Sequence, residues 1–276
     1  MRALRNFNEV VYSTNKMKRS GALHSFMRSR ASANLFVNVR TKTMKTFEIV
    51  YEDDNIFVIN KIAGISVHKT HPSDPNFTLA DALQKEYPYL AKVGEHPLRP
   101  GIVHRLDKET SGLMIVTKNN KAFSHFKKLF EERRIKKYYV ALVHGKPKKS
   151  SGTITAPLGK IGTRQTTQIK GKKELTERDA VTEYRTLKNF DNCTLLEITP
   201  KTGRTHQIRV HLKSIGSPIV GDKIYGPKKE SGKLGLAHMF LHAQRLEFTT
   251  PDGKSLAIES DIPRELTQAL ENLSRP

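Results

Sequence analysis

The residues best suited to chemistry lie in one short stretch, His104 to Leu113, with the sequence HRLDKETSGL. It places the carboxylate of Asp107 between the cations Arg105 and Lys108 and then enters an apolar run. A carboxylate can act as a nucleophile if it stays ionised, and a nearby guanidinium favours the charged form and orients it. A solvated loop whose charges pair with one another is equally compatible with the stretch, because surface ion pairs are common and contribute little. Taken alone, it leaves both interpretations open.

Tyrosines and arginines elsewhere in the chain could complete a site with that acid. Tyr138 and Tyr139 lie in a basic strand, and Arg204 and Arg209 lie in a later segment. An enzyme that acts on a base inside folded RNA must extrude the nucleotide at a cost of a few kcal/mol, and an aromatic ring offers the base roughly 1 to 3 kcal/mol of stacking. These residue types suit such a task.

Other chemistries find little support. His206 and His211 are five residues apart and so do not share a helical face, and Cys193 is the only thiol, so no metal site is expected. The segments GKIGTR and KTGRTHQ lack the spacing of a phosphate-binding loop, so no nucleotide cofactor is expected. Ser111 lacks the Gly-x-Ser-x-Gly frame of a nucleophile elbow and is interpreted as a turn residue.

The composition favours a polyanionic partner. Among 276 residues, 48 Lys and Arg face 27 Asp and Glu, giving a formal net charge of +21. Such a field attracts nucleic acid. No apolar run reaches the roughly 18 residues that span a bilayer, so no membrane partner is expected. A single cysteine is typical of a reducing compartment, and we expect a cytoplasmic protein.

Residues 1–43 differ from the rest, with nine Lys or Arg and one acid. This composition predicts a disordered tail, or a transit peptide that would direct the protein to mitochondria, or an upstream start that precedes the true one at Met44. We expect residues 44–276 to form one catalytic domain.

Periodicity predicts the elements of that domain. FEIVYEDD and IFVINK are expected to be strands, Leu79 to Tyr87 a helix, and LMIVTK a strand. A helix capped by Asn119 or Asn120 should bury Phe123, Phe126, Leu129 and Phe130.

KKYYVALVHGKP, CTLLEITP and the two halves of FLHAQRLEFTTPDGKSLAIESDIP should add strands, and HQIRVHLKSIG a helix. Residues 146–174 form a basic excursion that suggests a mobile hairpin, in which Lys170, Lys172 and Lys173 could hold phosphates. Several strands with two or three helices and no βαβ alternation predict an α+β fold with a mixed, largely antiparallel sheet.

The stretch HRLDKETSGLMIVTKN resembles the catalytic signature of the RluA family of pseudouridine synthases, in which Arg-Leu-Asp-x-x-Thr-Ser-Gly precedes an apolar strand. VINKIAGISVH (58–68), KYYVALVHG (137–145) and KTGRTHQIRVHL (201–212) are similar to the family's other motifs, and GDKIYG and LHAQRL follow in the expected order. The resemblance implies a pseudouridine synthase catalytic domain with flanking helices and a central RNA-binding cleft.

The resemblance also implies roles for individual residues. Asp107 would be the catalytic carboxylate, Arg209 its partner and Tyr139 the ring that stacks on the flipped base, with Tyr138 on the opposite face of the strand. Arg105 would help to extrude the uridine.

Three further residues would contact RNA or shape the pocket wall: Arg204, His206 and Lys137. Arg204 is equally compatible with a simple surface cation. Ile62 stands where the family usually has proline, which affects only local rigidity. The small RNA-binding domain found ahead of many relatives' catalytic domains has no counterpart in residues 1–43.

The implied reaction is isomerisation of uridine in rRNA or tRNA by a monomer, with Asp107 either adding to the uracil ring or acting at the anomeric carbon. It calls for no redox partner, metal or nucleotide. Two alternatives are an inactive RNA-binding or ribosome-assembly protein of the same fold, and a hydrolytic glycosylase. The glycosylase would need a second carboxylate, for which Glu109 is the near candidate.

Overall fold

The computed structural model describes residues 10–11, 45–161, 164–167, 177–227 and 234–274, and the structural statements below concern these residues. The strands are β1 (Val10–Val11), β2 (Phe47–Glu52), β3 (Ile56–Lys61), β4 (Ser111–Thr117), β5 (Lys136–His144), β6 (Ser151–Thr155), β7 (Gly159–Ile161), β8 (Arg164–Thr166), β9 (Val181–Asn189), β10 (Cys193–Pro200), β11 (Leu241–Thr249) and β12 (Ser255–Glu259). The helices are α1 (Leu79–Glu86), the short 3-10 helix η1 (Pro88–Lys92), α2 (Asn120–Glu131), α3 (Gln207–Ser214) and α4 (Arg264–Leu273).

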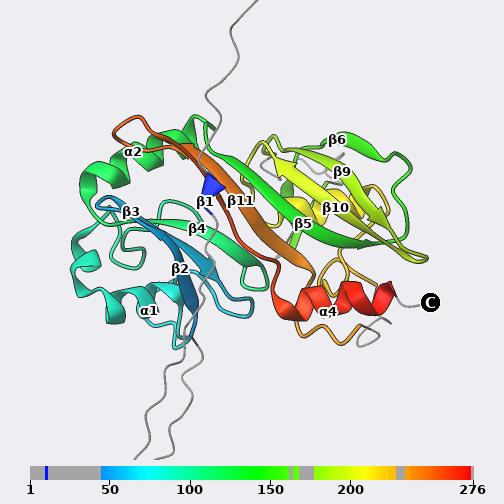
Figure 1. The fold of residues 1–276 in the computed structure, drawn as a ribbon, viewed down its shortest axis with the longest axis horizontal. Coiled ribbons are helices and arrows are strands. Elements are labelled where there is room, and N and C mark those ends of the chain that lie inside the picture. Colours follow the sequence, from blue (N-terminus) through cyan, green and yellow to red (C-terminus); the bar gives the residue numbers. More distant parts are fainter. Residues whose placement is uncertain (1–9, 12–44, 162–163, 168–176, 228–233, 275–276) are drawn as a thin grey trace, which may run out of the picture.

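Ten of the strands form one long sheet that runs through the whole described body (Figure 1). The order along its main path is β2-β3-β4-β11-β5-β10-β9-β6, with β12 added beside β11 and β1 beside β12. The β4–β11 and β1–β12 pairs are parallel, and the other pairs of this sheet are antiparallel. The predicted α+β fold with a mixed, largely antiparallel sheet is confirmed.

Helices cover both faces of the sheet, which explains why the central strands are apolar on both sides. In β3, Phe57 and Ile59 pack in the cluster that contains α1, whereas Ile56 and Val58 pack in the cluster that contains α2. All seven residues of β4 are buried for the same reason. The other half of the sheet is covered by α3 on one face and by α4 on the other.

The helix predicted at Leu79 to Tyr87 and the cap predicted for the next helix are confirmed, and α1 also has a capping box that was not predicted. Asn119 caps α2 by accepting a hydrogen bond from the Ala122 amide, and Thr78 and Asp81 form a capping box at the start of α1. The predicted apolar stripe of α2 lies in the core, with Phe123, Phe126 and Leu129 buried and Phe130 partly buried.

The sheet separates where β4 leaves β11. These strands share only two register pairs, Ser111 with His242 and Gly112 with Ala243. Gly112 has φ +119°, and a Cβ there would lie 2.4 Å from the Ala243 carbonyl oxygen, so only glycine fits this close approach. Further along β4, the segment Gly101–His104 contacts the strand through a bridge between Ile102 and Val116 and a 2.8 Å hydrogen bond from the Thr117 amide to the Gly101 carbonyl.

Three expectations need correction. Helix α4 was not predicted, and the described residues contain four α-helices rather than two or three. Ser111 is not a turn residue, because it begins β4 and is buried. The basic excursion is not one hairpin: β6 joins the large sheet beside β9, and only β7 and β8 pair as a small separate hairpin.

Two other expectations fall largely outside the described residues. Lys170, Lys172 and Lys173 lie there, as do residues 1–43 apart from Val10 and Val11, which pair with β12.

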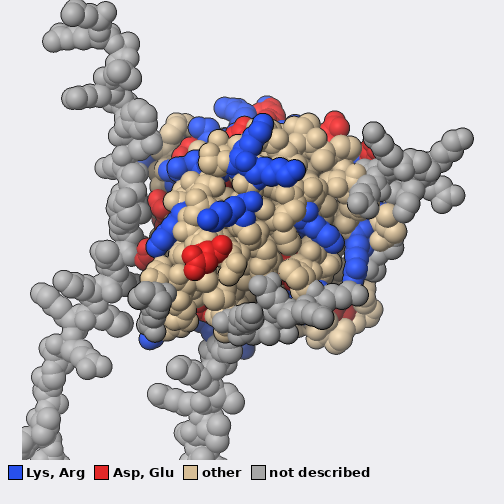
Figure 2. Space-filling view, turned by 90° about the vertical axis from the view of Figure 1, so that its right-hand side faces the viewer, with Lys and Arg blue, Asp and Glu red and all other residues tan. Residues whose placement is uncertain are grey.

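Lys and Arg side chains are spread over the body of the protein. Figure 2 shows the face at the right-hand end of Figure 1, where blue side chains outnumber isolated red ones. Among the described residues, no helix has the length and apolar character needed to cross a bilayer.

Candidate active site

A cleft of about 450 Å³ lies between the Val103–Thr110 loop, the start of β5, the end of α2 and the segment that leads into α3. A second hollow of about 370 Å³ adjoins it, lined by Ser66, Val67 and Gly221–Ile224. Arg105, Asp107, His206 and Arg209 line both. Tyr139 lines the first, so predicted residues from three distant motifs meet at one place.

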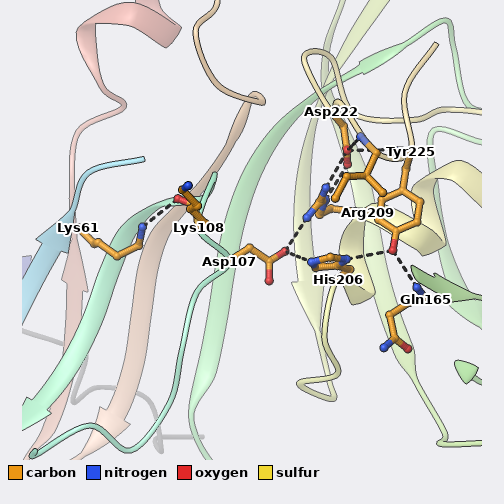
Figure 3. Close-up of polar contacts among 9 residues, drawn as sticks. Lys61, Asp107, Lys108, Gln165, His206, Arg209, Asp222 and Tyr225 are labelled. Atoms are coloured by element: carbon orange, nitrogen blue, oxygen red, sulfur yellow. Dashed lines mark hydrogen bonds and ion pairs between the residues drawn. The ribbon is translucent and has the colours of Figure 1, made fainter. Parts of the chain in front are cut away.

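Asp107 is at the junction of these hollows, in the loop that enters β4 (Figure 3). Its side chain is 19% exposed, and its Oδ2 lies 3.3 Å from Nη1 of Arg209 and 4.0 Å from Nε2 of His206. Within the described part of the chain, its Oδ1 has no hydrogen-bond partner. One carboxylate oxygen is therefore held by the protein while the other faces the cleft without a protein ligand.

Arg209 is oriented by a second acid, Asp222, that sequence reasoning missed. The Arg209 Nε and Nη2 donate to the two Asp222 oxygens at 2.7 and 2.8 Å, which is a two-pronged pair, and the Asp222 side chain is fully buried. Burial lowers the pKa of Arg209, but the hydrogen bonds and charges of Asp222 and Asp107 outweigh this and raise the pKa above its ordinary value. The guanidinium is therefore a fixed cation with one nitrogen left over for Asp107.

Asp222 is itself held in the charged form. Burial raises the pKa of its carboxyl, but the hydrogen bonds and charge of Arg209 and the backbone amides of Ile224 and Tyr225 lower it further, so that the net pKa is below its usual value. In the sequence, this residue appeared only as part of the motif GDKIYG, whose local pattern does not reveal the buried partner.

The loop before α3 is fixed by one buried amide. The Gln207 oxygen accepts from Thr202 Oγ1 at 2.6 Å and from the Arg204 amide at 3.0 Å, while its nitrogen donates to the Val181 carbonyl and to Thr182. This anchoring holds the neighbouring His206 at φ +54°, a left-handed conformation that is uncommon outside glycine.

In that conformation, His206 lies between Asp107 and Tyr225. Its Nδ1 is 3.0 Å from the hydroxyl of Tyr225, and its other ring nitrogen faces Asp107 (Figure 3). Burial is the main influence that lowers the pKa of His206, although the Asp107 charge opposes it. Tyr225, also absent from the sequence prediction, packs its ring 5.0 Å from the Arg209 guanidinium.

The two tyrosines of β5 point to opposite faces, as predicted. Tyr139 lines the cleft, whereas Tyr138 stacks under Arg245 at 3.9 Å on the other face. Burial and the charge of Asp107 raise the pKa of Tyr139, so its phenol stays protonated. A neutral aromatic ring beside the carboxylate is suited to a planar, uncharged base.

Lys61 supports the acid loop from the other side of Asp107 (Figure 3). It is buried, and its ammonium donates to the carbonyls of Ile62 and Ile65 at 2.8 and 3.0 Å and to that of Lys108 at 3.4 Å. Burial lowers the pKa of Lys61 to about 7. Sequence reasoning included this residue in a motif but gave it no role.

The other predicted residues are cations with few protein partners. The exposed Arg105 and the partly buried Lys137 both line the cleft, and neither side chain has a hydrogen bond or ion pair within the described ranges. Arg204 also lines the cleft and donates to the Asp179 carbonyl at 3.1 Å.

Two residues of the opening stretch have partners that the sequence did not indicate. The carboxylate of Glu109 lies 2.7 Å from Nδ1 of His238. Ser111 Oγ lies 2.9 Å from Nδ1 of the buried His242, whose other nitrogen lies 3.0 Å from Ser260 Oγ. Both contacts tie the Asp107 loop to the segment around β11.

A metal site is not evident in the part of the chain that the structure describes, where no three His, Cys, Asp or Glu side chains gather. The polar groups around Asp107 are cations and neutral rings, which do not form an oxygen-rich ligand set. The chemistry that this arrangement supports is that of a single oriented carboxylate beside an aromatic ring.

Comparison with known proteins identifies relatives of this arrangement. Residues 55–214 match the family model described as RNA pseudouridylate synthase. That range includes Asp107, Tyr139 and Arg209 but ends before Asp222.

Curated relatives are similar over most of the chain. An uncharacterised RNA pseudouridine synthase of Chloroflexus aurantiacus is 43% identical over 215 residues, which cover 78% of this chain and 65% of the relative. The ribosomal large subunit pseudouridine synthase D of Nitrosomonas europaea is 41% identical over 240 residues, which cover 82% of this chain and 66% of the relative. The chain thus spans about two thirds of the length of these two relatives.

A solved structure supports the same grouping. The human RNA pseudouridylate synthase domain-containing protein 1 superposes with a TM-score of 0.64 at 28% identity, covering 79% of this chain and 84% of that one.

Proposed function

The chain belongs to the RNA pseudouridylate synthase family, and from this premise we propose that it isomerises uridine to pseudouridine in RNA with Asp107 as the catalytic carboxylate. The observation that carries the proposal is the state of that carboxylate. One oxygen is held by Arg209 at 3.3 Å, and the other has no hydrogen-bond partner in the described chain and faces the cleft. A purely RNA-binding groove gains nothing from an oriented acid among cations.

The reaction rearranges bonds without net gain or loss of atoms. The bond from the ribose anomeric carbon to nitrogen 1 of uracil breaks, the ring turns, and a bond from the same carbon to carbon 5 forms. The hydrogen at carbon 5 leaves as a proton, and nitrogen 1 gains one. Asp107 takes part either by adding to the ring or by acting at the anomeric carbon, and both routes need it ionised and within reach of the flipped nucleotide.

The neighbours of Asp107 have distinct tasks in this proposal. Arg209 keeps the carboxylate in place, Tyr139 stacks on the extruded uracil, and Arg105 enters the RNA to hold open the space that the base leaves. Arg204, His206 and Lys137 contact the RNA along the cleft. The lack of a protein partner for Arg105 and Lys137 in the described ranges supports a contact with an external anion.

The substrate that we propose is rRNA or tRNA. The net charge of +21 supports a polyanionic ligand, and the name of the Nitrosomonas relative supports a ribosomal target. We further propose that the enzyme acts as a monomer in the cytoplasm, or in mitochondria if residues 1–43 direct it there, and that the isomerisation needs no added cofactor.

Site-resolved mapping of pseudouridine tests this function. RNA from cells lacking the gene is treated with a carbodiimide that marks pseudouridine, before and after complementation with the wild-type protein or Asp107→Asn. We expect at least one marked uridine to vanish in the deletion, to return with the wild type and to stay absent with Asp107→Asn. A deletion that loses no marked site, or a variant that restores it, would overturn the proposal.

A further inference from the structure

The end of helix α2 has an arginine where the backbone favours glycine. Arg133 has φ +58°, its amide donates to the Phe130 carbonyl at 3.2 Å, and the Arg134 amide donates to the Leu129 carbonyl at 2.9 Å. These two bonds form the Schellman ending of a helix, in which the left-handed position is usually glycine because a Cβ is strained there. Strained backbone retained at one position suggests that its side chain has a task.

The side chain of Arg133 is placed for such a task. It is exposed, it lines the same cleft as Asp107, and no acid within the described residues pairs with it. Its neighbour Arg134, by contrast, lies 3.4 Å from the carboxylate of Glu132. Two adjacent arginines therefore differ in that one is paired and the other faces the cleft without a partner.

The same contrast recurs three residues later in β5. Lys136 lies 3.4 Å from Glu247, whereas Lys137 has no side-chain partner in the described part of the protein and lines the cleft. Its ammonium lies 3.9 Å from where a Cβ of Gly203 would be, so it reaches toward the opposite wall. Burial and the charge of Arg133 lower the pKa of Lys137, which indicates two cations close together without a counter-ion.

The position of Lys137 along β5 indicates which ligand Arg133 and Lys137 could bind. Lys137 and Tyr139 are two residues apart on the same face of β5, a separation of about 7 Å. Lys137 is therefore the next side chain along this face of β5 from Tyr139, the ring proposed to stack on the base. Glu131 also lines this end of the cleft, but its carboxylate forms no ion pair with either cation within the described ranges.

We propose that Arg133 and Lys137 form an anion subsite that binds a backbone phosphate of the RNA next to the target uridine. The subsite positions the strand and takes no part in bond rearrangement. It deepens the proposed function and rests on it only in taking RNA as the ligand.

The test is the salt dependence of binding to a single-stranded oligouridylate of about 12 nucleotides, measured by fluorescence anisotropy between about 50 and 200 mM salt. The variant Arg133→Gly with Lys137→Met removes both cations. The matched control, Arg134→Ala with Lys136→Met, removes the same charge from the two paired neighbours. Each phosphate contact on a single strand contributes about 0.7 to the slope of log K against log salt, so loss of the one proposed phosphate contact should lower the slope by about 0.7 in the variant, with little change in the control.

Two further measurements keep the test decisive. Arg133→Gly should melt at or above the wild-type temperature, because glycine suits the left-handed position, so weaker binding cannot be attributed to misfolding. An oligouridylate with an uncharged methylphosphonate backbone should bind the wild type and the variant equally. Equal slopes for variant and control on the natural backbone would overturn the subsite.

The outcome is independent of catalysis. A reduced slope in the variant, together with no pseudouridine in the mapping experiment, would keep the subsite and remove the isomerase. Normal isomerisation with an unchanged slope would remove only the subsite.

Discussion

The cations around the cleft fall into two groups that the fold treats differently. Arg209 is buried, joined to Asp222 by two short hydrogen bonds and to Asp107 by a third. Arg105, Arg133 and Lys137 line the same cleft with no side-chain partner in the described part of the chain. The first group fixes the position of the carboxylate before substrate arrives, and the second leaves its charge available to an incoming polyanion. The difference suggests that chemistry and RNA binding are assigned to separate cations.

The largest effect is expected from removing Asp222, the acid that pairs with the buried Arg209. Asp222→Ala leaves Arg209 buried without its two-pronged partner, and the loss of one member of a buried ion pair costs about 3 to 5 kcal/mol. We expect urea unfolding to show a loss of this size, with isomerisation lost as well because Asp107 is no longer held.

Its control is an ion pair at the surface. Glu183 lies 2.7 Å from Lys201, and both side chains are nearly half exposed. Glu183→Ala should cost about 1 kcal/mol or less. Similar losses in both variants would mean that burial does not distinguish the two kinds of pair.

Acid pH should weaken the buried framework while leaving the exposed arginines charged. Burial lowers the pKa of His104 to about 3 and that of His242 to about 4, so both are neutral in the native state. The unfolded chain binds these protons near pH 6.5, so stability is fully present above that pH and falls as the pH drops toward the native values. Each histidine should cost about 2 kcal/mol at pH 5, measured by urea unfolding at pH 7 and pH 5.

The contribution of one histidine can be isolated. In His242→Gln, the difference in unfolding free energy between the two pH values should shrink by about 2 kcal/mol. The exposed His71 provides the comparison, and His71→Gln should retain the full difference. An undiminished pH effect in His242→Gln would show that this ring is not the source.

Arg105→Ala should have the smallest effect on stability and a clear one on rate. The side chain is exposed and unpaired in the described structure, so we expect the unfolding free energy to change by less than about 0.5 kcal/mol. Extruding a nucleotide costs a few kcal/mol, and without the inserted arginine the single-turnover rate should fall roughly tenfold or more. Lys85→Ala, which removes an exposed cation of α1 away from the cleft, should leave the rate unchanged; an equal loss there would point to general charge.

Much of this arrangement could be predicted from the sequence. Short β-rich runs bounded by turn residues located β2, β3 and β12, and Asn119 marked the start of α2, because strand propensity, turns and helix caps are local effects. The contact of Asp107 with Arg209 came from the resemblance, since a pair separated by 102 residues leaves no local pattern. The structure confirms that these two side chains are in contact, and their catalytic roles stay predictions.

The parts that escaped prediction depend on tertiary contacts. Asp222 appeared only as part of a loop motif, because nothing in GDKIYG indicates that its acid meets a buried arginine. Ser111 was taken for a turn residue because the parallel contact of β4 with β11 is made by chain segments 131 residues apart. Helix α4 was missed although Leu266 and Ala269 are spaced for one buried face, since so short a helix is stabilised mainly by packing on the sheet.

Release of the hydrogen at carbon 5 most directly tests the separation of chemistry from binding. RNA from cells lacking the gene, labelled with tritium at carbon 5 of uridine, is mixed with excess enzyme in a single turnover. We predict that Asp107→Asn releases no tritium while still binding the RNA, whereas Arg133→Gly with Lys137→Met still releases it once the enzyme is in sufficient excess to saturate the RNA. Tritium release by Asp107→Asn at the wild-type rate would contradict the account.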